Sequence, residues 1–153
     1  MNLLLDTNVL IDYLGRKKPF FEDAERLMAM GYFGDAKLWA PIQSFKDAFY
    51  VLAHYVDSEK IQAAMLALLD LVHPVDLSGG DLATAAKLKW VDFEDCLVAV
   101  SAAKAGADYV VTRDRKGFDR SLVPIISPAD LLRQMSEEGG VTYGAVEIES
   151  IQP

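Results

Sequence analysis

Apolar residues begin almost at the first position and predict a buried strand that is followed at once by a helix. The run Leu3–Leu5 is fully apolar, stops at Asp6, and resumes at Val9 with helical spacing that ends near Gly15. Asp6 therefore stands at the carboxyl end of the first strand. Because open α/β sheets bind their ligands at the carboxyl ends of the strands, we expect Asp6 at the functional edge.

The rest of the chain alternates between short apolar runs and longer segments with helical periodicity. The predicted strands cover residues 38–40, 74–76, 109–112 and 123–126, and the predicted helices cover 20–33, 43–56, 58–72, 78–90, 94–105 and a segment that starts at 128. Such alternation is typical of an α/β fold with a parallel sheet, here of about five strands. The pattern decays from Glu137, so we expect one domain over 1–136 and a tail over 137–153 that is extended or pairs with a partner.

Composition narrows the class of protein. The 153 residues include a single cysteine, Cys96, which fits a reducing cytosol. We find no signal-peptide pattern and no apolar run long enough to span a bilayer, so we expect a cytoplasmic protein. The net charge of −8 argues by itself against nucleic-acid binding, and fits a cation site or a basic partner.

Acidic residues gather where the predicted elements end. Asp6 follows the first strand, Asp114 follows the fourth, and Asp92 and Asp95 open the nearly all-apolar helix over 94–105. Each has a simple structural explanation, as a helix cap, a turn residue or a charge that suits a helix N-terminus. Together, however, these carboxylates would repel one another, so either their pKa values rise or a divalent cation neutralises them.

Oxygen ligands favour Mg²⁺ or Mn²⁺ as that cation. Neither His54 nor His73 is placed as an alternative ligand, and no cysteine–histidine spacing indicates zinc. The chain also lacks a glycine-rich phosphate loop and a nucleophile-elbow serine.

Three segments in this order resemble the PIN domain family, and within it the VapC-like ribonucleases. They are the run from Leu3 to Asp12, the segment Asp92–Leu97, and Val111–Asp114 with Phe118 shortly after it. Their order and spacing extend over most of residues 1–130. The resemblance implies a three-layer α/β/α fold and a Mg²⁺- or Mn²⁺-dependent endonuclease that hydrolyses RNA.

The resemblance also assigns site residues. The family's first acid falls on Asp6, the third on Asp95 with Asp92 as a common companion, and the fourth on Asp114. The second acid is usually a glutamate, and the matching helix carries Asp47, which is one methylene shorter. Two further positions, Asn8 and Thr112, match polar residues that hold the carboxylates or a water.

The same resemblance also implies which partners the protein binds. Many VapC-like proteins are toxins silenced by an antitoxin that is basic or inserts a segment into the acidic groove, and many form homodimers. Basic residues in loops are candidates to contact RNA at the rim of the site, foremost Arg16, Lys17, Arg113 and Arg115, together with Lys18, Lys116 and Arg120.

Three other functions remain open from the sequence. A phosphatase with Asp6 as nucleophile, as in haloacid-dehalogenase-like enzymes, needs a second acid where Asn8 stands. A binding module without catalysis is compatible with the altered second acid at Asp47. A metal-dependent nuclease for structured DNA would use the same carboxylates.

Overall fold

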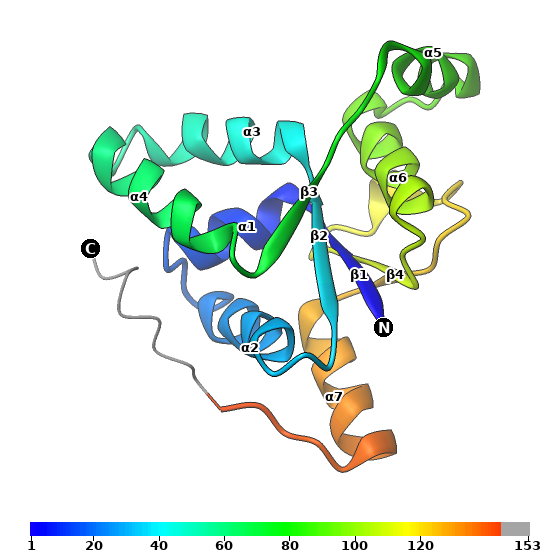
Figure 1. Cartoon of the computed structure of the whole chain (residues 1–153). Coiled ribbons are helices and arrows are strands. Elements are labelled where there is room, and N and C mark those ends of the chain that lie inside the picture. The colour runs from blue at the N-terminus through cyan, green and yellow to red at the C-terminus, as the bar shows by residue number, and fades with distance from the viewer. Residues whose placement is uncertain (145–153) are drawn as a thin grey trace.

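A computed structural model describes residues 1–144 of the chain (Figure 1). The elements are β1 (Asn2–Leu5), α1 (Thr7–Leu14), α2 (Phe21–Tyr32), β2 (Lys37–Pro41), α3 (Ile42–Leu52), α4 (Ser58–Leu68), β3 (Val72–Val75), α5 (Gly79–Leu88), α6 (Phe93–Ala105), β4 (Tyr109–Val111), the short 3₁₀ helix η1 (Lys116–Phe118), β5 (Ile125–Ile126) and α7 (Pro128–Gly139).

The strands form one parallel sheet in the order β3-β2-β1-β4-β5, which confirms the predicted α/β class and the number of strands. β1 is central, with Leu4 paired to Trp39 of β2 and Leu5 paired to Val111 of β4. The chain builds β2 and β3 on one side of β1 and then crosses to build β4 and β5 on the other. The carboxyl ends of β1 and β4 therefore flank the point where the strand order reverses, which is where such sheets bind ligands.

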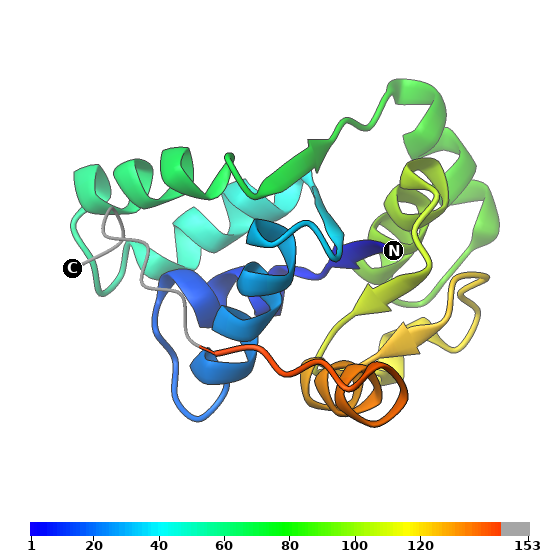
Figure 2. The same cartoon turned by 60° about the horizontal axis from the view of Figure 1, so that its bottom comes forward.

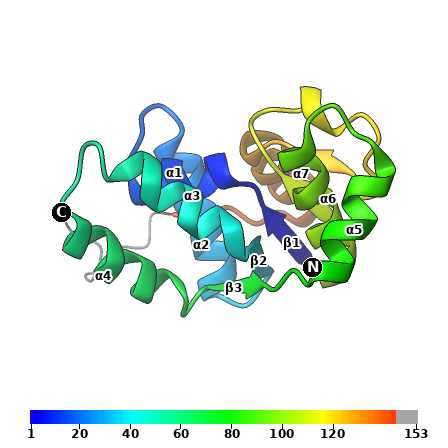
Figure 3. The same cartoon turned by 90° about the horizontal axis from the view of Figure 1, so that it is seen from above.

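Helices cover both faces of the sheet (Figures 1 and 2). Leu3 and Leu5 of β1 point into the larger core, which they share with α1, α2 and α7. Leu4 points the opposite way and packs with Val98 and Ala102 of α6. The view in Figure 3 shows α3 and α4 on one side of the strands and α5 and α6 on the other.

Several boundaries differ from the sequence prediction by a few residues, since α3 ends at Leu52 and β5 begins at Ile125, and the boundary between α4 and β3 places a residue in another element. We expected the helix after residue 58 to reach Val72 and the third strand to start at Pro74, but α4 ends at Leu68 and Val72 begins β3. Val72 is buried and pairs with Leu38 of β2, so its apolar side chain serves the sheet rather than the helix. Pro74 is tolerated within this strand because β3 lies at the edge of the sheet.

Residues beyond the expected domain end at 136 continue the fold. α7 runs to Gly139, and Gly140 caps it with a positive φ of 64°. The Tyr143 hydroxyl then donates to Asp35 Oδ2 at 2.9 Å, and the Tyr143 side chain packs on the larger core. Residues 141–144 form no strand, and the rest of the predicted tail lies outside the described residues. Within residues 1–144, no helix is both long and apolar enough to cross a membrane.

Candidate active site

Asp6 lies where β1 passes into α1. Its backbone N–H donates to Val111 O at 3.0 Å, so Asp6 extends the pairing of β1 with β4 by one residue. Its side chain caps α1, because Oδ1 accepts from Thr7 N at 2.8 Å. The residue is only 7% exposed. The buried strand therefore delivers this carboxylate to the edge of the sheet, and the cap fixes its direction.

The Thr112 hydroxyl connects the acids that end the two central strands. It donates to Asp6 Oδ2 at 2.8 Å and accepts from Asn8 Nδ2 at 3.0 Å and from Asp114 N at 3.1 Å. Thr112 is fully buried, so these bonds do not compete with solvent. Asn8 Nδ2 also lies 3.4 Å from Asp6 Oδ2. The side chains of Asn8 and Thr112 thus orient Asp6 and place Asp114 beside it.

The start of α6 brings further acids to the same edge. Asp92 caps the helix, with Oδ1 accepting from Asp95 N at 3.0 Å, and Glu94 and Asp95 occupy the first turn. A Cβ added to Gly117 would lie 1.5 Å from Asp95 Oδ2. The absence of a side chain at Gly117 therefore leaves the space that the Asp95 carboxylate occupies.

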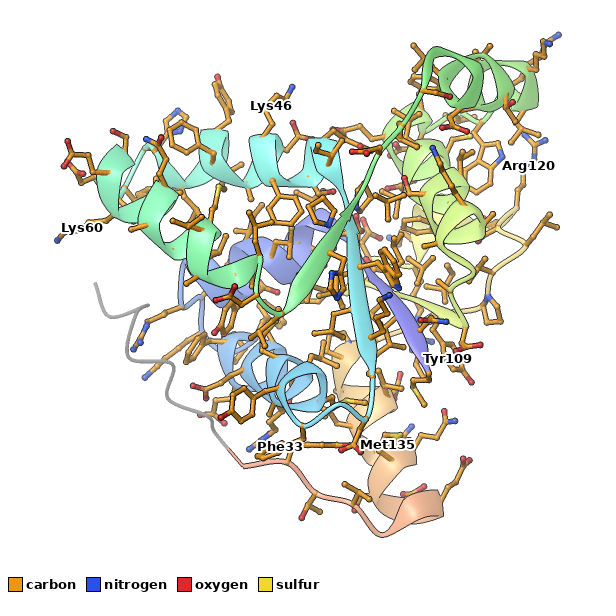
Figure 4. All side chains as sticks on the ribbon, in the orientation of Figure 1. Phe33, Lys46, Lys60, Tyr109, Arg120 and Met135 are labelled. Carbon is orange, nitrogen blue, oxygen red and sulfur yellow. The ribbon has the colours of Figure 1, made fainter. Side chains whose placement is uncertain are left out.

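The fourth side of the site comes from α3. Thr7 Oγ1 donates to Ser44 Oγ at 2.8 Å, which joins the first turns of α1 and α3, and Ser44 is fully buried. Asp47 stands one turn further along α3, with its side chain 31% exposed. Lys46 Nζ lies 3.4 Å from Asp47 Oδ1, while the Lys46 side chain is itself 80% exposed at the outer surface (Figure 4).

These elements enclose a pocket of about 390 Å³ at the carboxyl edge of the sheet. Its walls include all five of the acids singled out from the sequence, since Asp6, Asp47, Asp92, Asp95 and Asp114 line it. Asn8 lines it as well, and Thr112 lies beneath it through its bonds to Asp6 and Asn8.

The carboxylates raise one another's pKa. The pKa of Asp95 rises to about 7, mainly because burial disfavours its charged form, and further because Asp92, Asp6 and Asp114 are close. Burial also raises the pKa of Asp6, assisted by Asp114 and Glu94, although the bonds from Thr112 and Thr7 oppose this rise. A site that holds so much negative charge is stabilised by a proton or by a cation.

The donor set fits a hard divalent cation, since it consists of carboxylate oxygens with amide and hydroxyl groups nearby. As the side chains stand, no three acidic, histidine or cysteine residues among residues 1–144 are arranged to hold one ion directly. An ion held by Asp6, Asp95 and Asp114 therefore requires a change of side-chain rotamer or bridging waters. Mg²⁺ commonly keeps several of its waters in proteins.

The basic residues proposed for RNA contact have different surroundings. Arg113 forms two hydrogen bonds with buried Asp12, at 2.6 and 3.2 Å, and its guanidinium lies 3.9 Å from the centre of the Phe20 ring. Arg115 pairs with Asp130 of α7. Arg16 lies over the Phe21 ring at 5.4 Å, and Lys17 is exposed in the loop that follows α1. None of these four residues lines the acidic pocket.

Sequence reasoning missed several residues of the pocket. Glu94 lines it, although the run of three acids in residues 92–95 already signalled more charge than a helix cap needs. Gln43 and Ser44 also line it, and Gln43 Oε1 is buried with no hydrogen-bond partner among the described residues. Nothing in the sequence identified these two polar residues as part of a site, because such side chains are common at the start of a helix.

Known proteins share both the sequence pattern and the fold. The family model described as PIN domain matches residues 2–116. No curated protein matches the chain. Among solved structures, VapBC2 from Rickettsia felis bound to a DNA fragment from its promoter is 18% identical, with a TM-score of 0.61 over 83% of this chain and 98% of that one.

Two other solved structures are similar to the same degree. VapBC-1 from nontypeable Haemophilus influenzae is 17% identical, with a TM-score of 0.63 over 84% of this chain and 99% of that one. A toxin–antitoxin complex from Klebsiella pneumoniae is 17% identical, with a TM-score of 0.60 over 82% of this chain and 97% of that one. At these identities the likeness establishes the fold alone.

Proposed function

Because the chain belongs to the PIN domain family, whose members are nucleases, we propose that it is a divalent-metal-dependent endoribonuclease that hydrolyses phosphodiester bonds in RNA. One observation supports this proposal above the others. Carboxylates from β1, α3, α6 and the loop after β4 line one pocket at the point where the strand order reverses.

In this function the acids would serve as metal ligands or as groups that support the ligands. Asp6, Asp95 and Asp114 would hold a Mg²⁺ or Mn²⁺ ion, supported by Asp92 or Asp47. Such an ion, when bound, lowers the pKa of a coordinated water and offsets the charge that develops on the phosphate. Asn8 and Thr112 would keep the Asp6 carboxylate in one orientation, so that little reorganisation accompanies the reaction.

The rival use of Asp6 as a phosphatase nucleophile has little support in the geometry. Asp6 Oδ1 is engaged by Thr7 N, and Oδ2 is engaged by Thr112 and Asn8. Asn8, which stands where that chemistry needs a second acid, instead donates to Thr112. The position of the second acid is thus occupied by an amide that is already bonded to Thr112.

We propose in addition that an antitoxin masks the site. Solved structures of similar fold are toxin–antitoxin complexes. The net charge of −8 and the acidic pocket suit a partner segment that is basic. Assembly as a homodimer, which the resemblance implies, belongs to the same proposal and is checked by the mass of the purified chain in solution.

Cleavage of single-stranded RNA tests the enzymatic proposal. The wild type is expected to cut with Mg²⁺ or Mn²⁺ and to stop when EDTA is added, and Asp95→Asn is expected to lose at least a hundredfold in rate. Asp70→Asn, at an exposed position on a turn, is the matched control and should cut like the wild type. Equal cutting by Asp95→Asn and the wild type would show that the acidic pocket is not the active site.

The same assay separates the remaining alternatives. A branched DNA substrate that is cut faster than RNA would favour a nuclease for structured DNA. A folded chain that cuts neither substrate, after any copurified partner is removed, would favour a binding module.

A further inference from the structure

A second hollow lies directly beside the acidic pocket. It has a volume of about 350 Å³ and shares Asp92, Asp95 and Asp114 with that pocket. Its remaining walls come from the segment before α6 and from η1 with the turn that follows, which contribute Trp90, Lys116 and Arg120. We call this hollow the Trp90 subsite. The shared carboxylates make it continuous with the proposed site of cleavage.

The indole of Trp90 forms a fixed apolar wall of the subsite. Trp90 is partly buried and packs on the core cluster that includes Val98 and Phe118, so one part of the ring is anchored while the rest borders the hollow. The guanidinium of Arg120 lies 6.0 Å from the centre of the ring. Figure 4 shows Arg120 at the edge of the molecule beside α6. An aromatic face next to a cation is a common arrangement where proteins bind single-stranded nucleic acid.

The cations of this subsite are available to a ligand. Within residues 1–144, neither Lys116 nor Arg120 forms an ion pair, whereas Arg113 and Arg115 are bound to Asp12 and Asp130. Asp119 also lines the hollow, and Asp92, Asp95 and Asp114 are shared with the acidic pocket, so the lining is mixed in charge. A ligand of this subsite needs a negatively charged group next to Lys116 and Arg120 and a flat ring next to the indole of Trp90.

The turn that carries the cations is held against the acids. Gly117 lies so close to Asp95 that a Cβ there would overlap Oδ2, and Lys116 N donates to Asp114 Oδ1 at 3.2 Å. The segment that carries Lys116 and leads to Arg120 is therefore in contact with two of the shared carboxylates. RNA bound at the Trp90 subsite would therefore be aligned with the carboxylates of the acidic pocket.

We propose that the Trp90 subsite binds the nucleotide next to the scissile phosphate of single-stranded RNA. The base would stack on Trp90, and Lys116 and Arg120 would hold its phosphate. A paired strand keeps its bases stacked inside the helix, so this subsite selects an unpaired segment. The inference rests on the proposed nuclease function, because it assumes that RNA lies across Asp92, Asp95 and Asp114.

Fluorescence of Trp90 gives a direct readout. The chain has two tryptophans, so Trp39→Phe leaves Trp90 as the only one. Titration of this variant with a single-stranded RNA dodecamer, in the presence of Ca²⁺ in place of Mg²⁺, should quench the emission. The same RNA annealed to its complement should quench it far less. A dodecamer of the same sequence in DNA measures how far the 2′-hydroxyl contributes to binding.

Substitutions then assign the parts of the subsite. Trp90→Leu should weaken binding of the dodecamer by five- to a hundredfold and raise the KM for cleavage more than it lowers kcat, while Trp90→Phe should retain most of the affinity. The double variant Lys116→Gln with Arg120→Gln should reduce the slope of log K against log salt by about 0.7, the value for one neutralised phosphate on a single strand.

Two exposed residues provide matched controls. Tyr55→Leu removes an aromatic ring that is 85% exposed, and Lys60→Gln removes a cation on α4, far from Arg120 in Figure 4. Both variants should bind and cut like the wild type.

The outcomes separate this proposal from the nuclease function. Metal-dependent cleavage with unchanged affinity and KM in Trp90→Leu and in the lysine–arginine double variant would overturn the subsite and leave the nuclease intact. Quenching by the RNA dodecamer with no cleavage would overturn the nuclease and leave the subsite as a nucleotide-binding surface. Equal quenching by the single strand and the duplex would contradict the selection of unpaired RNA.

Discussion

At the scale of single residues, folding changes the pKa of Asp95 more than that of the other described acids. Its pKa rises from 3.8 to about 7 because burial and the neighbouring Asp92, Asp6 and Asp114 disfavour the ionised form. In the unfolded chain these influences vanish. The folded state therefore prefers protonated Asp95, and stability is lost as the pH rises from about 4 through about 7.

We expect this loss to appear in the metal-free protein. The melting temperature of the wild type in EDTA should fall between pH 5 and pH 8, whereas Asp95→Asn should show a flatter profile and melt higher at pH 8. Because Asp95 is partly exposed, screening reduces the difference to about 1–2 kcal/mol, or about 2–8 °C. Parallel pH profiles for the two proteins, measured by circular dichroism, would contradict the assigned pKa.

Arg113 illustrates how a residue expected to bind RNA can be needed for the fold. Its two hydrogen bonds reach Asp12, whose side chain is 2% exposed, and Phe20 covers its guanidinium. Removal of one member of a buried ion pair leaves the other charge unpaired, which typically costs 3–5 kcal/mol. Contact between Arg113 and RNA would therefore compete with this pair.

We expect Arg113→Gln to lower the free energy of unfolding by about 3 kcal/mol, measured by urea denaturation. Arg115→Gln is the matched control, because Arg115 pairs with Asp130 where both side chains are more exposed, and it should cost less than about 1 kcal/mol. A similar small loss for both variants would show that the Asp12 pair contributes little, and would return Arg113 to the candidates for RNA contact.

At the scale of elements, local signals in the sequence predicted the starts of the helices well. α4 and α7 begin at the predicted residues 58 and 128, where Asp57 and Ser127 cap them, and α5 begins one residue after the predicted 78, where Ser78 forms a capping box with Asp81. Val72 was assigned to the wrong element, because its apolar side chain suits either the end of a helix or the start of a buried strand. Only the pairing with Leu38 decides between these possibilities.

The gathering of the acids could likewise be predicted from the sequence, but the contacts that orient them could not. Asp6, Asp92, Asp95 and Asp114 come together because each stands next to the end or the start of an element, and the topology brings those ends to one edge, whereas Asp47 reaches the pocket from within α3. The contacts that orient them are not local. Arg113 and Asp12 are 101 residues apart, and Thr7 and Ser44 are 37 apart, so no spacing rule reveals either pair.

The 3₁₀ helix η1 gives a prediction of its own. In Gly117→Ala the new methyl group would overlap the Asp95 carboxylate, so either η1 or Asp95 must shift. We expect cleavage of RNA to fall at least tenfold, with a smaller effect on the melting temperature. Gly79→Ala is the matched control, because a Cβ there meets no atom within 4 Å, and it should cut normally. Normal cleavage by Gly117→Ala would show that the observed position of Asp95 is not required.

At the scale of the whole molecule, the site joins the two helical layers. α1 and α3 approach the pocket from the larger core, and α6 approaches it from the smaller one. Within residues 1–144, the only elements common to both sides are the strands, above all β1, whose Leu3 and Leu5 face one core and whose Leu4 faces the other. A single buried strand thus sets the position of Asp6 relative to Asp95 and Asp47 together.

The extent of the folded unit leads to the last prediction. A chain that ends after residue 136 would lose the cap of α7 at Gly140 and the bond from Tyr143 to Asp35, and would expose part of the larger core. We expect it to melt at least 5 °C below the full chain, whereas a chain that ends after residue 144 keeps these contacts. Tyr143→Phe in the full chain should cost about 1 kcal/mol, which separates the hydrogen bond from the packing. If the chain ending after 136 melted with the full chain, residues 137–144 would be dispensable, and the boundary expected from the sequence would mark the folded unit after all.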